Sequence, residues 1–162
     1  FSLAGLEIEA FETRHSKQCL AYRFADRDDA GGGGVDGATD DGDGDDDEDT
    51  GGDDGATDDT AGGDFVFSGD TEAFGGLANF ADGARVLAHD CSFPDEVDVS
   101  NHPTPSELGR TLAAADAAVG RVYLTHLYPH TEGKHGAMLD SVADHYEGEV
   151  RFARDGLSVD VE

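Results

Sequence analysis

Alternating apolar and polar positions predict most of the regular structure in this chain. Residues 6–13 place Leu6 and Ile8 between glutamates, the period-two pattern of a strand with one buried face. A second strand is predicted over 19–24, and residues 65–67 form a short apolar run typical of a third. Further strands are expected at 85–89, 121–125, 149–153 and 157–161, and helices at 73–82, 104–119 and 134–146. Strands that alternate with helices in this way indicate the α/β class.

The helix predicted from residue 104 has the clearest start signal. Thr104 is suited to the N-cap, Pro105 to the first helical position, and Glu107 to the third, where its side chain can reach back to the cap. The following apolar periodicity predicts a helix to about Val119, ended by Gly120.

Residues 26–63 interrupt this pattern with a tract of Gly, Asp, Ala and Thr that contains almost nothing apolar. Such a segment cannot bury enough surface to offset its ordering entropy, so we expect it to be disordered. A long insertion between two strands is tolerable because closure entropy grows only slowly with loop length. We therefore predict one domain formed by residues 1–25 and 64–162, with 26–63 as a disordered Gly/Asp-rich insertion.

The large negative charge of the chain indicates the ionic environment in which it folds and the kinds of partner it can bind. The 162 residues include 37 Asp and Glu against 10 Lys and Arg, a formal net charge of −27. The repulsion among these negative charges is relieved at molar salt, so a salt-adapted cytoplasm is expected. The sequence also offers no broad basic face that could bind nucleic acid. The two cysteines, Cys19 and Cys91, form no paired motif, which fits a reducing cytoplasm. No apolar run is long enough to span a membrane.

Potential metal ligands follow the ends of several predicted strands. Asp70 comes directly after the run at 65–69, His126 ends the strand at 121–125, His15 ends the first strand, and His102 lies just before a helix start. Strand ends are rigid while the loops beyond them stay open to substrate. Imidazoles with a carboxylate are the ligands of Zn²⁺ and similar ions, so this placement points to metal-assisted hydrolysis.

Five segments together resemble one known family. They are His15–Phe24, with a His seven positions before a Tyr-Arg pair; Ser68-Gly69-Asp70-Thr71; Ala84–Phe93, which contains His89-Asp90-Cys91-Ser92-Phe93; Asn101-His102-Pro103-Thr104 with Glu107; and Leu124-Thr125-His126. In this order and spacing the chain resembles the C-terminal part of a metallo-β-lactamase-fold hydrolase of the ribonuclease Z-like branch. The resemblance implies an αβ/βα sandwich, of which this chain would be the C-terminal part carrying a disordered acidic insertion.

The resemblance also implies roles for particular residues. Asp70 would bridge two Zn²⁺ ions (with Mn²⁺ or Fe²⁺ as alternative metals), His15 and His126 would each hold one ion, and His102 would contact the scissile group. Asp70 and His102 are therefore the expected catalytic residues. Asp90 and Glu107 would support the imidazole rings, His89 is as readily structural, and His130 and His135 receive no role.

Two departures from the family pattern bear on function. The His-x-His-x-Asp-His motif is absent, and we expect it to lie before Phe1, so that this chain would be a fragment. The family carries its tRNA-gripping arm where this chain has the acidic tract containing Asp45-Asp46-Asp47-Glu48-Asp49, which would repel a phosphate backbone. This argues against dedicated tRNA 3′ processing, while a small-molecule or phosphodiester substrate still fits.

Several alternatives remain open at the level of sequence. The favoured function is a metal-dependent phosphodiesterase of ribonuclease Z type, acting through metal-activated water. A thioester or lactone hydrolase on the same fold is a second interpretation. A third is a non-catalytic partial domain whose acidic tract binds a basic partner. The sequence is also compatible with a homodimer.

Overall fold

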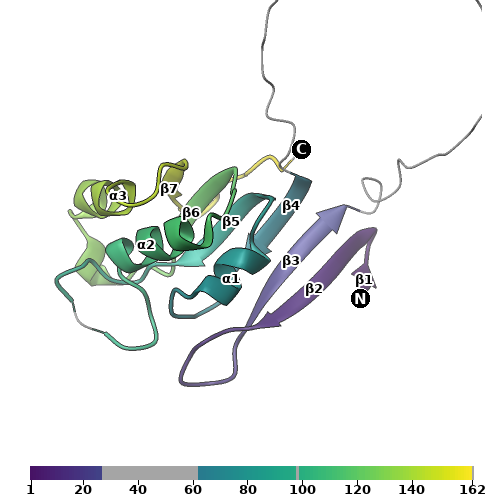
Figure 1. Ribbon diagram of the computed structural model, residues 1–162, viewed down its shortest axis with the longest axis horizontal. Helices are drawn as coiled ribbons and strands as arrows, with labels where there is room; N and C mark the ends of the chain where they lie inside the picture. Colours follow the sequence, from purple (N-terminus) through teal and green to yellow (C-terminus); the bar gives the residue numbers. More distant parts are fainter. Residues whose placement is uncertain (27–61, 98, 162) are drawn as a thin grey trace, which may run out of the picture.

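The computed structural model describes residues 1–26, 62–97 and 99–161, and places seven strands in one sheet (Figure 1). The strands are β1 (Ser2–Leu3), β2 (Leu6–Glu12), β3 (Leu20–Asp26), β4 (Gly62–Phe67), β5 (Ala84–Asp90), β6 (Arg121–Thr125) and β7 (Val150–Phe152). The helical segments are α1 (Gly75–Phe80), α2 (Pro105–Ala115), the 3₁₀ turn η2 (Pro129–Thr131) and α3 (His135–Ala143). The predicted α/β class is confirmed.

The order of strands in the sheet follows the order in the chain. Strands β1 to β4 pair antiparallel as hairpin-like neighbours, whereas β4, β5, β6 and β7 are mutually parallel. Each parallel connection contains one α-helix, the usual form of such a crossover, and the β6–β7 connection also contains η2. The carboxyl ends of β4, β5 and β6 consequently meet at one edge of the sheet, and this edge carries the candidate site.

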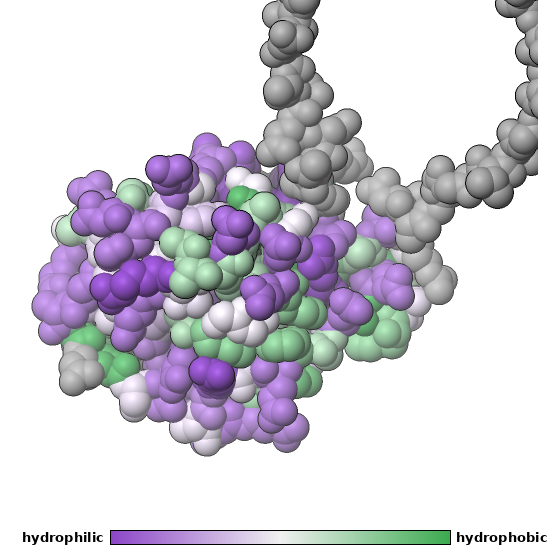
Figure 2. Space-filling view, in the orientation of Figure 1, coloured by the Kyte–Doolittle hydropathy of each residue, from purple (hydrophilic) through white to green (hydrophobic). Residues whose placement is uncertain are grey.

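The helices bury one face of the sheet. Every second residue of the parallel strands, such as Val66, Leu87, Val122 and Leu124, points into the main core. That core is completed by helix residues on the same side, namely Ala78, Ala81, Leu108, Leu112, Met138 and Val142. In Figure 2 this face of the molecule is mostly hydrophilic at its surface, with apolar residues gathered toward the middle and over β2 and β3.

The opposite face of the parallel strands is covered by an irregular segment. Residues 157–161 do not form the strand predicted for them. Their alternation has another cause, because Leu157, Val159 and Val161 pack against Val86, Ala88 and Tyr123 on this face without pairing to a strand. The prediction of a closing strand at 149–153 is confirmed over its middle, at β7.

Helix α2 begins where the sequence predicted but ends earlier than expected. The predicted capping box is present: the Thr104 backbone N–H donates to Glu107 Oε2 at 2.9 Å, and the Glu107 backbone N–H donates to the Thr104 side chain. The predicted end near Val119 was wrong. Asp116 adopts a left-handed conformation with φ 51°, and the helix ends at Ala115. Asp is one of the residues that tolerate this conformation, which provides an earlier stop than Gly120.

The disordered insertion predicted over 26–63 lies outside the described residues except at its two ends. Strand β3 continues through Asp26, and β4 begins at Gly62, so both strands run slightly farther toward the insertion than expected. The tract at 27–61, including its acidic run, is not described. Within the described residues, no helix combines the length and apolar character needed to cross a lipid bilayer.

Candidate metal centre

A buried hydrogen-bond network joins the ends of β4 and β5. The backbone N–H of Asp90 donates to Ser68 Oγ at 2.9 Å, and Thr71 N–H donates to Asp90 Oδ2 at 3.1 Å. Ser92 Oγ donates to the other carboxylate oxygen of Asp90 at 2.6 Å. Ser68, Thr71, Asp90 and Ser92 are all fully buried. Since buried carboxylates are costly unless their oxygens are satisfied, this network fixes Asp90 in one position.

Gly69 makes the turn that brings Asp70 into the site. Its φ of +61° lies in the left-handed region, and a Cβ there would stand 2.8 Å from the carbonyl oxygen of Leu20. A side chain is therefore excluded both by conformation and by the approach of β3. The turn is tied to the segment after β2, because the Thr13 hydroxyl donates to the carbonyl of Asp70 at 3.2 Å.

His126 follows β6 in an unusual backbone conformation. Its φ is +58°, a left-handed value that is uncommon for non-Gly residues, although Asn, Asp and His adopt it more often than the others. In this position its Nδ1 lies 2.7 Å from Asp70 Oδ1. Residues in such sparsely populated conformations cluster at functional sites, which makes this conformation consistent with a role for His126 beyond packing.

His102 lies beside this pair and is held by Asp90. The distance between His102 Nδ1 and Asp90 Oδ2 is 2.6 Å. The ring centre of His102 is 5.4 Å from that of His126 and 5.3 Å from that of His15. The structure thus gathers His15, Asp70, His102 and His126, the four residues singled out from the sequence, together with Asp90.

The side chains nearest to one another are suited to a divalent cation. Ligand atoms of Asp70, Asp90 and His126 all lie within 4.8 Å of one another. Two carboxylates and an imidazole form a donor set that suits Zn²⁺ and related divalent ions. Both oxygens of Asp90 also accept hydrogen bonds, so Asp70 and His126 are the better ligands. His15 is not part of this closest group; its Nδ1 instead accepts from the backbone N–H of Lys17 at 3.4 Å and lies 3.7 Å from Cys19 Sγ.

The other histidines and Glu107 occupy different environments. His89 is buried, and its Nδ1 lies 2.7 Å from the carbonyl oxygen of Asp90. Burial lowers the pKa of His89, so its ring is held neutral as a structural group. Glu107 accepts hydrogen bonds from the backbone N–H and the hydroxyl of Thr104, at the start of α2. His135 stacks on Phe152 at 4.3 Å between ring centres.

Sequence reasoning missed an aromatic wall around the candidate site. Tyr128 stacks on the ring of His126 at 5.5 Å and on Phe93 at 4.7 Å, and His130 contacts Phe93 at 5.5 Å. Tyr128 and His130 come from the turn just after the last strand-end histidine. The aromatic character of the Leu127-Tyr128-Pro129-His130 segment was the available signal, but nothing in one sequence placed Phe93 against it.

Comparison with solved structures identifies the architecture. The metallo-beta-lactamase fold protein YhfI from Bacillus subtilis matches with a TM-score of 0.65 and 21% identity, over 97% of this chain and 49% of that one. The short form of human tRNase Z matches with a TM-score of 0.58 and 15% identity, over 100% of this chain and 46% of that one. The chain has the metallo-β-lactamase fold.

Sequence comparison places this metallo-β-lactamase-fold chain near the ribonuclease Z proteins. It is 32% identical over 100 residues to ribonuclease Z of Haloferax volcanii, covering 59% of this chain and 31% of that protein. It is 31% identical over 100 residues to ribonuclease Z of Myxococcus xanthus, covering 59% of this chain and 32% of that protein. No family model matches. The chain spans about a third of the length of these curated relatives, and the predicted resemblance to ribonuclease Z proteins is confirmed.

Proposed function

We propose that this chain supplies one side of the active site of a metal-dependent hydrolase that cleaves phosphodiesters, with Zn²⁺ as its metal. The observation that carries the proposal is the convergence of Asp70, Asp90 and His126 within 4.8 Å at the carboxyl ends of parallel strands. The fold and the sequence likeness to proteins named ribonuclease Z support the reaction class. Because the chain spans only about a third of those relatives, the activity of the whole protein is part of this proposal.

Asp70 and His126 are the residues we expect to hold the metal. A bound divalent ion would supply Lewis-acid activation of a water molecule near neutral pH. These two donors do not complete a four-coordinate site, so further ligands are needed. We propose His15 as one of them and polypeptide outside this chain as the source of others. The bridging of two ions by Asp70 rests on the family resemblance.

We propose that His102 assists departure of the leaving group. Asp90 accepts the Nδ1 proton of His102, which fixes the ring and leaves Nε2 to face substrate. In the imidazolium form, whose Nε2 also carries a proton, His102 can pass that proton to the leaving oxygen or donate a hydrogen bond that stabilises charge on the phosphoryl group. Asp90 is therefore a positioning residue in this scheme, while His102 contacts the substrate.

The substrate is proposed to be a phosphodiester other than a folded tRNA precursor. The net charge of −27 opposes broad contact with a nucleic-acid backbone. Thioesters and lactones are the alternative substrates for the same fold. Since the acidic composition supports a salt-rich cytoplasm, activity is best measured at molar KCl, where the Debye length is about 3 Å.

The test uses the full-length product of the gene that encodes this chain. We expect it to hydrolyse bis(4-nitrophenyl) phosphate in preference to thioester and lactone panels, to lose activity on chelation, and to regain it with Zn²⁺. Asp70→Asn should lower kcat/KM by about 10³-fold or more, since a metal supplies several kcal/mol of transition-state stabilisation. Asp144→Asn, an exposed substitution at the end of α3, is the matched control. Chelation-resistant hydrolysis would overturn the proposal.

A further inference from the structure

Tyr128 lies two residues after the candidate ligand His126, and its ring stacks on the imidazole of that histidine. The two ring centres are 5.5 Å apart, and the ring planes differ by 14°. The Tyr128 ring also stacks on Phe93, with 4.7 Å between ring centres and 24° between planes. Aromatic rings in such offset, nearly parallel arrangements attract one another beyond the effect of the area they bury. Tyr128 therefore connects His126 to the segment after β5.

The backbone of Tyr128 is fixed by hydrogen bonds on both sides of the residue. Its N–H donates to the carbonyl oxygen of Ser92 at 3.2 Å. Its carbonyl oxygen accepts from the backbone N–H of Thr131 at 3.0 Å and from the Thr131 hydroxyl at 2.8 Å. Ser92 and Thr131 are both buried. Tyr128 is thus well placed to act as a fixed support for the ring beside it.

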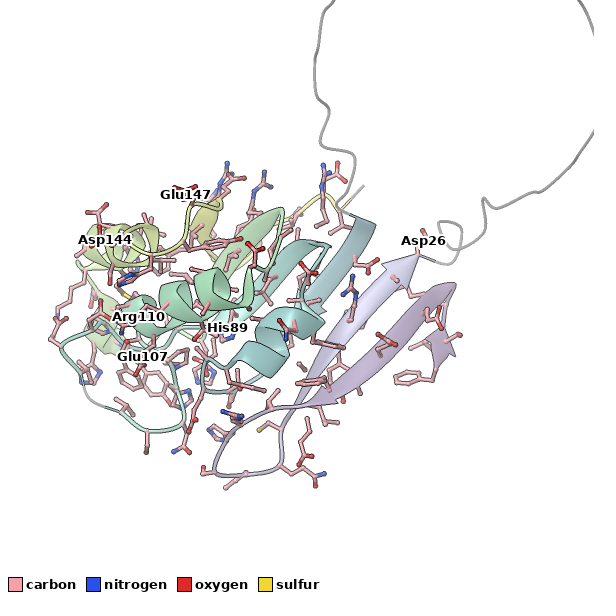
Figure 3. The ribbon with its side chains drawn as sticks, viewed as in Figure 1. Asp26, His89, Glu107, Arg110, Asp144 and Glu147 are labelled. Atoms are coloured by element: carbon pink, nitrogen blue, oxygen red, sulfur yellow. The ribbon has the colours of Figure 1, made fainter. Side chains whose placement is uncertain are left out.

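His126 is a residue that needs such a support. Its left-handed backbone conformation persists only where the surrounding structure determines it strongly. The residue before it is held, since the Thr125 hydroxyl donates to the carbonyl oxygen of His89 at 3.1 Å. Figure 3 shows His89 in the interior of the molecule, where it is buried.

The His126 ring has two close neighbours of different kinds. One is Asp70 Oδ1, which lies 2.7 Å from its Nδ1. Asp70 is itself a candidate ligand, so this contact changes when both side chains bind a metal. The stack on Tyr128 uses the face of the imidazole rather than its nitrogens, so it is compatible with metal binding by His126.

We propose that Tyr128 is a positioning residue that holds the His126 imidazole in the orientation in which it binds the metal. The inference rests on the proposed function and adds a residue to its metal centre. A ring already stacked on Phe93 and His126 has little free face for substrate, which favours this role over direct stacking on a substrate. Neighbours that orient a metal ligand contribute to metal affinity without touching the ion.

The test measures metal affinity and ligand geometry in the full-length gene product. Competition with a chromophoric chelator gives the affinity for Zn²⁺, and the visible absorption spectrum of Co²⁺ bound in its place reports the ligand geometry. We expect Tyr128→Leu to bind Zn²⁺ about 10–100-fold more weakly than the wild type and to change the Co²⁺ spectrum. Tyr128→Phe keeps the ring and should retain the wild-type affinity and spectrum. Phe152→Leu removes the ring that stacks on His135 and, as the matched control, should also bind like the wild type.

The outcomes separate this inference from the function on which it rests. If the wild type binds neither Zn²⁺ nor Co²⁺, the proposed metal centre fails and the role of Tyr128 fails with it. If the wild type binds both ions and Tyr128→Leu has the same affinity and spectrum, the role of Tyr128 is overturned while the hydrolase stands. Equal weakening in Tyr128→Leu and Tyr128→Phe also overturns it, because the hydroxyl rather than the ring would then be responsible. Tyr128 is 41% exposed, so its truncation leaves little buried void, and thermal unfolding of the metal-free variants checks that they are folded.

Discussion

Asp70 and His126 follow different strands, β4 and β6, yet Asp70 Oδ1 lies 2.7 Å from His126 Nδ1. The contact depends on two left-handed residues, Gly69 before the aspartate and His126 itself. Strand β5 lies between β4 and β6 and contributes Asp90 from its own end. Three neighbouring parallel strands thus present a compact donor set, which is the structural basis for the proposed metal centre.

Removal of the His102 imidazole should slow the reaction without removing metal. For His102→Ala we expect kcat to fall by about 10²–10⁴-fold, the usual contribution of a positioned acid or base. Added imidazole should restore part of the rate, which a merely structural residue would not permit. His145→Ala, an exposed histidine after α3, provides the control. Unchanged kcat in His102→Ala would contradict the assigned role.

Asp95, in the segment after β5, forms hydrogen bonds to α2 and α3, and this should make part of the stability depend on pH. Asp95 accepts hydrogen bonds from the Ser106 backbone at 3.0 Å and from the Ser141 hydroxyl. Burial acts to raise the pKa of Asp95, but these hydrogen bonds outweigh it and lower the pKa below its ordinary value. Because the pKa of Asp95 is lower in the folded state, its carboxylate stabilises the folded protein at pH values above the unfolded-state pKa. This stabilisation is lost as the pH falls from there through the folded-state pKa.

Asp95→Asn should therefore lower Tm at pH 7, and its difference from wild type should shrink as the solution is acidified below about pH 4. Differential scanning calorimetry across this range measures the effect. Asp144→Asn should show no comparable convergence. A difference between wild type and Asp95→Asn that stays constant with pH would show that the carboxylate charge is not the stabilising feature.

The packing of α2 against α3 depends on a glycine. A Cβ at Gly109 would lie 2.7 Å from the carbonyl oxygen of Val142, whereas a Cβ at Gly136 would meet nothing within 4 Å. Gly109→Ala should reduce the free energy of unfolding by about 1–3 kcal/mol, because backbone must shift to admit the methyl group. Gly136→Ala should raise the free energy of unfolding by up to about 1 kcal/mol through helix propensity. Denaturant titration distinguishes the two, and equal effects would contradict the close approach of the two helices at Gly109.

The sequence was informative where local rules decide the outcome. Alternation predicted the strand around Ile8, and a short apolar run predicted the strand around Val122. The Thr104–Glu107 capping box was recognisable because its spacing is fixed by helix geometry. The order of motifs indicated the fold, and it was enough to group Asp70, His102 and His126 in one candidate site.

Other features depend on tertiary contacts that one sequence does not encode locally. Leu157 and Val159 alternate like strand residues, but they cover a sheet face without pairing. The left-handed conformation of His126 is not signalled by the sequence, since His adopts such values more often than most residues but still only in a minority of cases. The stack of Tyr128 on Phe93 likewise requires the ends of β5 and β6 to be placed beside each other.

The most direct test of the central claim is a measurement of bound metal in the full-length gene product by elemental analysis after exhaustive dialysis. We expect the wild type and Asp144→Asn to retain Zn²⁺ at a defined stoichiometry. Asp70→Ala and His126→Ala should retain less metal, with circular dichroism spectra like that of the wild type. Equal metal retention in Asp70→Ala, His126→Ala and the wild type would contradict the assignment of Asp70 and His126 as ligands.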